Sequence, residues 1–108
     1  MLKYLKFMDQ VKQINKQFEL SYYEIELLDK AAKAHFSEQK IFARDLIYQR
    51  SVASQATLHA VFKGLLDKKL LSTKSHEEDG RIKKVTSKKL ALEHCKRLHR
   101  EINRVSVK

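Results

Sequence analysis

Residues 54–86 read SQATLHAVFKGLLDKKLLSTKSHEEDGRIKKVT, which is the pattern of a helix followed by a β-hairpin. Ser54 is suited to cap the helix, because a serine side-chain oxygen can accept a hydrogen bond from the backbone of the first turn. The apolar residues that follow recur at the three- and four-residue spacing of one helix face, and they are Leu58, Val61, Phe62, Leu65 and Leu66. We therefore expect a long helix with Gln55, His59 and Lys63 on its solvent face.

After Asp67 the pattern changes to that of two short strands. Residues 70–74 (LLSTK) and 81–86 (RIKKVT) predict the strands, and residues 75–80 (SHEEDG) predict the turn between them. The Asp79-Gly80 dipeptide is a strong hairpin signal, because both residue types tolerate the positive φ angles that tight hairpin turns require. The sequence thus predicts a helix that leads directly into a hairpin.

Three more helices are predicted upstream, over residues 2–18, 22–36 and 44–48. The first carries one apolar stripe, made of Leu2, Leu5, Met8, Val11, Ile14 and Phe18. The second begins with the capping-box pattern of Ser21 and Glu24, with Leu20 as the hydrophobic staple. Its apolar residues at helical spacing are Tyr22, Ile25, Leu28, Ala32 and Phe36.

A last helix is expected to start at Thr86 or Ser87 and to run to about Val105. One of its sides carries Leu90, Leu98, Ile102 and Val105. The resulting order is helix, helix, short helix, long helix, hairpin, helix, which is the order of a winged helix-turn-helix. The predicted fold class is therefore mainly α with a small β-hairpin wing, and 108 residues correspond to a single domain over positions 1–108.

The composition favours a polyanionic partner. Lys and Arg outnumber Asp and Glu by 23 to 13, and the net charge is +10. Such a surplus points first to nucleic acid and second to an anionic membrane surface. No apolar run exceeds three residues, so we expect no membrane span, and the basic helices lack the Trp/Phe-rich face that surface binding prefers.

Several classes of chemistry are disfavoured. The sequence has neither a Gly-rich phosphate loop nor a suggestive Ser/His/Asp set, so we expect no enzymatic activity and no cofactor. The segment His76–Asp79 resembles a metal site in composition only, because four consecutive turn residues converge poorly on one ion; we expect no metal. The single cysteine, Cys95, fits a reducing cytoplasm, and without a resolving partner we expect it to be structural rather than redox-sensing.

Parts of the chain resemble the multiple-antibiotic-resistance regulator (MarR) family. Residues 56–65, followed by 67–71, are similar to the recognition helix of that family and to its exit into the wing. Asp79-Gly80-Arg81 resembles the wing signature of Asp, any residue, Arg. The resemblance covers roughly Leu20 to Glu93 and implies a regulator that binds duplex DNA through the helix and the wing.

The chain also departs from the family pattern. Lys69 stands where the family usually has Gly, which predicts a different cap or a longer helix. Ser87-Lys88 replaces the usual Leu-Thr after the second strand, and the chain is shorter than typical members at its C-terminal end. We therefore assign no small-molecule effector.

The expected DNA contacts divide by chemistry. Residues at the start of the long helix are expected to meet base edges in the major groove, and they are Ser54, Gln55, Thr57 and His59. Arg81 on the wing is expected to reach the minor groove, with an ion pair to Asp79 orienting its side chain. The alternative is that this ion pair only braces the hairpin. The lysines expected on phosphates are Lys63, Lys74, Lys83 and Lys84.

The terminal helices have two readings. They either pack only on each other or interleave with a second copy, and we prefer the homodimer, because two recognition helices could then address two half-sites. The alternative function is a winged-helix module for protein–protein interaction without specific DNA binding. Exposed aromatic or aliphatic residues on the outer face of the long helix would favour that alternative.

Overall fold

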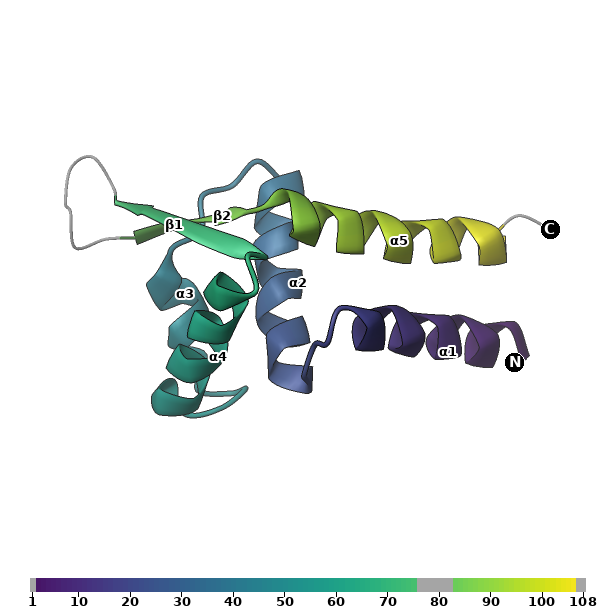
Figure 1. The fold of residues 1–108 in the computed structure, drawn as a ribbon, viewed down its shortest axis with the longest axis horizontal. Coiled ribbons are helices and arrows are strands. Elements are labelled where there is room, and N and C mark those ends of the chain that lie inside the picture. The colour runs from purple at the N-terminus through teal and green to yellow at the C-terminus, as the bar shows by residue number, and fades with distance from the viewer. Residues whose placement is uncertain (1, 76–82, 107–108) are drawn as a thin grey trace.

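The structure, a computed structural model, describes residues 2–75 and 83–106, with side chains described up to residue 104. In these ranges the chain forms five helices and one hairpin (Figure 1). Their order is α1 (Leu2–Gln17), α2 (Tyr22–Phe36), α3 (Ala43–Ile47), α4 (Gln55–Asp67), β1 (Leu71–Ser75), β2 (Lys83–Ser87) and α5 (Lys89–Ser106). The predicted fold class, a mainly helical winged helix-turn-helix, is confirmed.

The elements divide into a body and an extension. Helices α2, α3 and α4 pack together at one end with the hairpin, while α1 and α5 run side by side away from them (Figure 1). The described chain is elongated, with extents of 50 × 27 × 23 Å. The wing and α4 therefore lie at the opposite end of the molecule from the chain termini.

One apolar core holds the body together. Its fully buried large side chains come from α2, α3, α4 and the start of the hairpin, and they are Leu27, Leu28, Leu46, Leu58, Leu65, Leu70 and Leu71. Burying a leucine stabilises a fold by roughly 1.5–3 kcal/mol, so this set fixes how α4 and the hairpin sit on α2. The predicted core face of α4 is confirmed, with Leu58, Phe62 and Leu65 buried.

The capping box of α2 is confirmed, but its buried face is rotated from the predicted one. The Ser21 N–H donates to Glu24 Oε1 over 2.9 Å, and the Glu24 N–H donates to Ser21 Oγ over 3.3 Å. Of the predicted apolar row, the two end residues are mostly exposed, Tyr22 at 67% and Phe36 at 62%. Leu28 is the one member of that row that is fully buried, and the core takes Leu27, Ala31 and Ala34 beside it, because α2 must face α4, the wing and α5 together.

Three helices end in the same way, each with a non-glycine residue in the left-handed region. The φ angles are 56° at Glu19, 55° at Glu38 and 62° at Lys69. At the end of α4 the Lys69 N–H donates to the Leu66 carbonyl and the Leu70 N–H to the Leu65 carbonyl, which is a Schellman motif. Lys69 thus adopts the conformation for which glycine is usual, so the expectation of a different cap or a longer helix is wrong.

The hairpin is confirmed, and each of its strands ends one residue later than predicted, at Ser75 and Ser87. Its register pairs Leu71 with Ser87 and Ser75 with Lys83. A bridge between Phe42 and Lys84 adds the segment before α3 to the outer edge of β2. Residues 76–82, which include the predicted Asp79-Gly80 turn and Arg81, lie outside the described residues.

Helix α5 differs from the prediction in its start and in its buried side. It starts at Lys89, because Thr86 and Ser87 are still paired with β1. On the expected apolar side Leu90 is 45% and Ile102 47% exposed, whereas Ala91, His94 and Glu101 are buried. The contact with α1 is partly polar, because His94 on α5 is hydrogen-bonded to Asn15 on α1. The buried side of α5 therefore differs from the side that the apolar residues predicted.

No helix in the described part of the chain is both long and apolar enough to cross a membrane.

Candidate nucleic-acid interface

The N-terminus of α4 is an exposed, polar helix end. Ser54, Gln55 and Thr57 are all exposed. Ser54 Oγ accepts from the Thr57 N–H over 3.2 Å and donates to Thr57 Oγ1 over 2.9 Å, which confirms Ser54 as the cap. The serine hydroxyl is thereby committed to the helix, while the threonine hydroxyl keeps its own proton for an outside acceptor.

One row of polar side chains continues along the solvent face of α4. Gln55, His59 and Lys63 follow each other at four-residue spacing and are all exposed, as predicted. None of the exposed large apolar side chains in the described part of the chain lies on α4. The outer face of this helix therefore offers hydrogen-bonding and cationic groups to a partner.

The far end of α4 is anchored to the first turn of α2. Lys68 Nζ lies 2.9 Å from Glu24 Oε1 and also donates to the carbonyl of Glu19. A Cβ on Gly64 would lie 3.4 Å from Glu24 Oε2, so the two helices approach closely here. Burial raises the pKa of Glu24, but the Ser21 hydrogen bonds and Lys68 together outweigh it, and the net pKa lies below the usual value.

The wing strands carry the predicted lysines on their accessible parts. Lys74 and Lys83 are exposed and Lys84 is half-buried. Lys83 Nζ donates to Ser75 Oγ over 3.3 Å, whereas Lys74 stands directly opposite Lys84 in the register. Like charges opposite each other destabilise a hairpin, and a bound anion would remove that repulsion.

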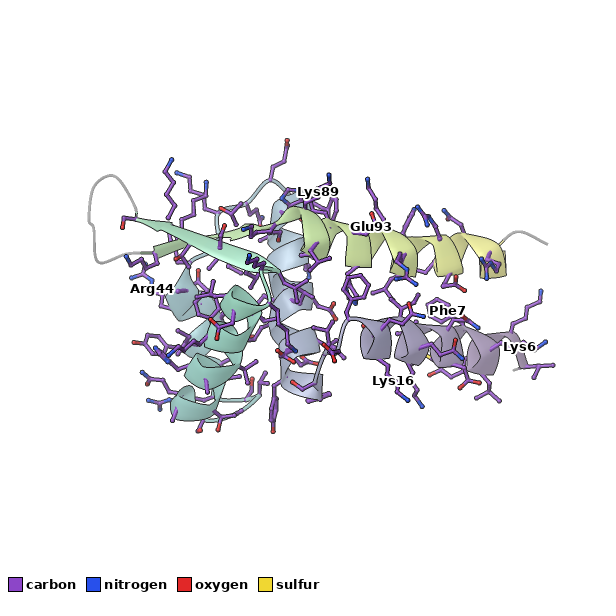
Figure 2. All side chains as sticks on the ribbon, in the orientation of Figure 1. Lys6, Phe7, Lys16, Arg44, Lys89 and Glu93 are labelled. Atoms are coloured by element: carbon purple, nitrogen blue, oxygen red, sulfur yellow. The ribbon has the colours of Figure 1, made fainter. Side chains whose placement is uncertain are left out.

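The sequence missed a second group of cations beside the wing. Lys30, Lys33, Lys40 and Arg44 line one cleft of about 590 Å³ between α2 and α3. These residues come from two helices and the loop between them, so no local motif marks them. Figure 2 shows Arg44 at the outer end of the body, on α3 below the outer ends of the wing strands.

Other titratable candidates lie away from this surface. Burial, and secondarily Asp29, raises the pKa of the half-buried Cys95 thiol, which disfavours the reactive thiolate. No three His, Cys, Asp or Glu side chains gather into a metal-binding group within residues 2–75 and 83–104. Three of the four residues in His76–Asp79 are acidic, and the whole segment lies outside the described residues.

Comparison with known proteins finds structural likeness only. No protein-family model matches the sequence, and no curated protein matches it. The structure of MepR from S. aureus in complex with DNA matches with a TM-score of 0.76 and 13% identity, covering 94% of this chain and 80% of that one.

Two further structures match over a similar length. A MarR mutant from E. coli has a TM-score of 0.66 and 13% identity, covering 94% of this chain and 71% of that one. A structure described as a putative MarR-like transcription regulator from Bacillus cereus has a TM-score of 0.65 and 16% identity, covering 95% and 70%. At such identities the likeness establishes the shared fold.

Proposed function

We propose that this chain, which has the winged helix-turn-helix fold of MarR-type regulators, is a sequence-specific transcription regulator that binds duplex DNA. Its 108 residues act as one DNA-binding domain, without catalysis, in the cytoplasm. The observation that carries the proposal is the outer face of α4, where Gln55, His59 and Lys63 are exposed and where none of the described chain's exposed large apolar side chains lies.

The N-terminal half of α4 has the side chains that base reading requires. An α-helix fits the major groove, and a glutamine can bond an adenine edge with two hydrogen bonds. Gln55 and Thr57 therefore read bases, with His59 one turn further along. Ser54 acts mainly by holding the helix end in shape, because its hydroxyl is already bonded to Thr57.

Phosphate contacts supply most of the affinity. Lys63 on α4 and Lys74, Lys83 and Lys84 on the wing bind the backbone and set the register of the protein on the duplex. Arg81 enters the minor groove from the wing. The MepR structure that shares this fold is a DNA complex, which supports the same mode of binding for this chain.

The alternative, a module for protein–protein interaction, finds less support. A protein-docking face on α4 would need large apolar side chains at its surface, and those exposed in the described part of the chain lie on other elements. We therefore assign protein–protein contact to the terminal helices α1 and α5 and not to α4.

That protein is a second copy of the chain. Helices α1 and α5 project together from the body (Figure 1) and leave large apolar side chains uncovered, with Leu2 64%, Leu5 52% and Ile102 47% exposed. A dimer through these helices would present two copies of α4 to two half-sites about one DNA turn apart, ~34–36 Å.

Enrichment from a random duplex library tests the sequence-specific part of the proposal. The protein should select one sequence motif, and Gln55→Ala should relax the preference at one or two base pairs while Lys63→Ala weakens binding to all sequences. A library that shows no enriched motif after several rounds with the folded protein contradicts sequence-specific binding.

A further inference from the structure

The cleft between α2 and α3 carries four cations, from Lys30, Lys33, Lys40 and Arg44, above an apolar floor. Lys33 and Lys40 are exposed on its rim, Arg44 is exposed at its outer end, and Ala34 and Ile41 are buried beneath them. Tyr48, which is 61% exposed, adds a phenol group to the wall. The cleft is about 590 Å³ in volume, so it can accept groups as large as a sugar-phosphate unit.

Part of this charge is already used, and part is free to meet a ligand. Lys30 Nζ donates to the Asp45 carbonyl over 3.2 Å and lies 3.4 Å from Gln49 Oε1, so Lys30 holds α2 to α3. The one carboxylate in the lining, that of Asp45, accepts from the Phe42 N–H over 2.9 Å. Lys33 and Lys40 form no ion pair with any described residue, and both charges face water.

The cleft is continuous with the wing. A second hollow of about 330 Å³ shares Gln39, Lys40 and Ile41 with it and reaches Lys84 on β2. The Arg44 guanidinium lies 5.7 Å from the centre of the Phe42 ring, and Phe42 is itself bridged to Lys84. The cations on α2, the loop and α3 therefore form one strip with the lysines of β2.

This strip lies at the DNA-binding end of the molecule. Figure 2 shows Arg44 on α3 beside the wing strands, at the opposite end from Lys6 on α1. A row of flexible, exposed cations along an open cleft suits a repeating chain of phosphates better than one small anion, because each lysine can follow a separate phosphate.

We propose that the strip formed by Lys33, Lys40 and Arg44 binds the phosphate backbone of the duplex beyond the stretch that α4 and the wing contact. The proposal rests on the proposed DNA-binding function. It extends the footprint of each protomer with contacts that add affinity and salt dependence but no base reading. Lys30 acts as a positioning residue that keeps the two walls of the cleft together.

The test compares two triple variants of equal charge. The strip variant is Lys33→Gln/Lys40→Gln/Arg44→Gln, and the control is Lys6→Gln/Lys12→Gln/Lys16→Gln on α1. Binding to a selected duplex is followed by fluorescence anisotropy from ~50 to ~200 mM salt. Each lost phosphate contact lowers the slope of log affinity against log salt by ~0.9, so the affinity ratio across this range shrinks about threefold for each strip residue. The control should leave the slope unchanged, and circular dichroism should show both variants folded.

Three outcomes would count against the strip. A strip variant with the same salt slope as the wild type would overturn the proposal. An equal decrease of the slope in the strip and control variants would also overturn it, since that would be an effect of net charge. A small-anion site would be indicated if tripolyphosphate bound the wild type and not the strip variant while the DNA slope stayed the same. The proposed function fails separately, if the wild type itself does not bind DNA or if Lys83→Gln on the wing leaves the slope unchanged.

Discussion

Glu24 and Lys68 join the first turn of α2 to the end of α4 through an ion pair of 2.9 Å. Lys68 also donates to the carbonyl of Glu19, the residue that ends the turn between α1 and α2. One ammonium group therefore connects the turn that follows α1, the first turn of α2 and the end of α4. This contact adds to the apolar core in holding α4 on α2.

Removing the charge of Glu24 should destabilise the fold by about 1–2 kcal/mol. A hydrogen bond between charged groups contributes roughly 1.5–3 kcal/mol, and the Lys68 side chain, 35% exposed, retains some hydration. Glu24→Gln is the informative change, because glutamine preserves the capping box. Urea unfolding measures the loss, and Glu26→Gln, two residues along α2, is the matched control.

The same pair predicts a dependence on acid pH. Because the folded-state pKa of Glu24 is lowered, its contribution is present above about pH 4.3 and is lost as the pH falls through the folded pKa. The stability difference between wild type and Glu24→Gln should therefore narrow at the acid end. A difference that is constant with pH contradicts the ionised pair.

His94 predicts a second loss of stability, at milder pH. Its ring is buried between α5 and α1, where Nε2 lies 2.7 Å from Asn15 Oδ1 and the ring meets Phe18 edge-on. Burial, and then Arg97, lowers its pKa. The unfolded chain therefore takes up a proton below about pH 6.5 that the folded chain resists, and stability falls as the pH decreases through that value.

His94→Gln is the test of this effect, because an amide can still donate to Asn15 but does not titrate. The melting temperature of the wild type should fall more steeply between pH 7.5 and pH 5.5 than that of the variant. The other histidines are common to both proteins and cancel in the comparison. Parallel curves would show that His94 does not titrate between the two states.

Glycine at the helix ends should stabilise the chain. A non-glycine residue in the left-handed region destabilises the folded state by about 1–2 kcal/mol. Glycine removes this strain, but its greater conformational entropy in the unfolded chain offsets roughly 0.4–1 kcal/mol of the gain. Lys69→Gly and Glu38→Gly should each therefore raise the unfolding free energy by about 0.5–1 kcal/mol. Ser37→Gly, at a φ of −92°, should lower it. A gain at all three positions would contradict the conformational explanation.

Dimer formation should depend on the exposed apolar residues of α1 and α5. Leu5→Glu and Ile102→Glu each place a charge within the proposed interface, where an unpaired charge is strongly unfavourable. Sedimentation should show a monomer for these variants and a dimer for the wild type. Phe36→Glu on α2, where the side chain is also mostly exposed, should leave the dimer intact. A monomeric wild type would contradict the dimer directly.

The sequence predicted best where a local pattern and a cap agree. Ser21 with Glu24 and Ser54 with Thr57 placed the starts of α2 and α4 correctly, because capping involves residues three apart. The core face of α4 followed from Leu58, Phe62 and Leu65, which face a purely apolar environment. The two short strands predicted over residues 70–74 and 81–86 placed the wing correctly to within a residue at their ends.

The sequence predicted less well the features that depend on contacts between elements far apart in the chain. The buried side of α5 includes His94 because Asn15, 79 positions away, supplies its hydrogen bond. The cations around Arg44 come together only when α2 and α3 pack, so no spacing rule reveals them. The left-handed Lys69 shows a third limit, because packing of Leu65 and Leu70 holds a conformation that its residue type disfavours.

The most direct measurement of the central claim is fluorescence anisotropy on a mixed-sequence duplex pool from ~50 to ~200 mM salt, with Arg81→Ala beside the wild type. If a dimer neutralises ~6–10 phosphates, its affinity should fall ~10³–10⁵-fold across this range, and the variant should bind more weakly throughout. No binding of the folded wild type at the low-salt end would contradict a DNA-binding regulator.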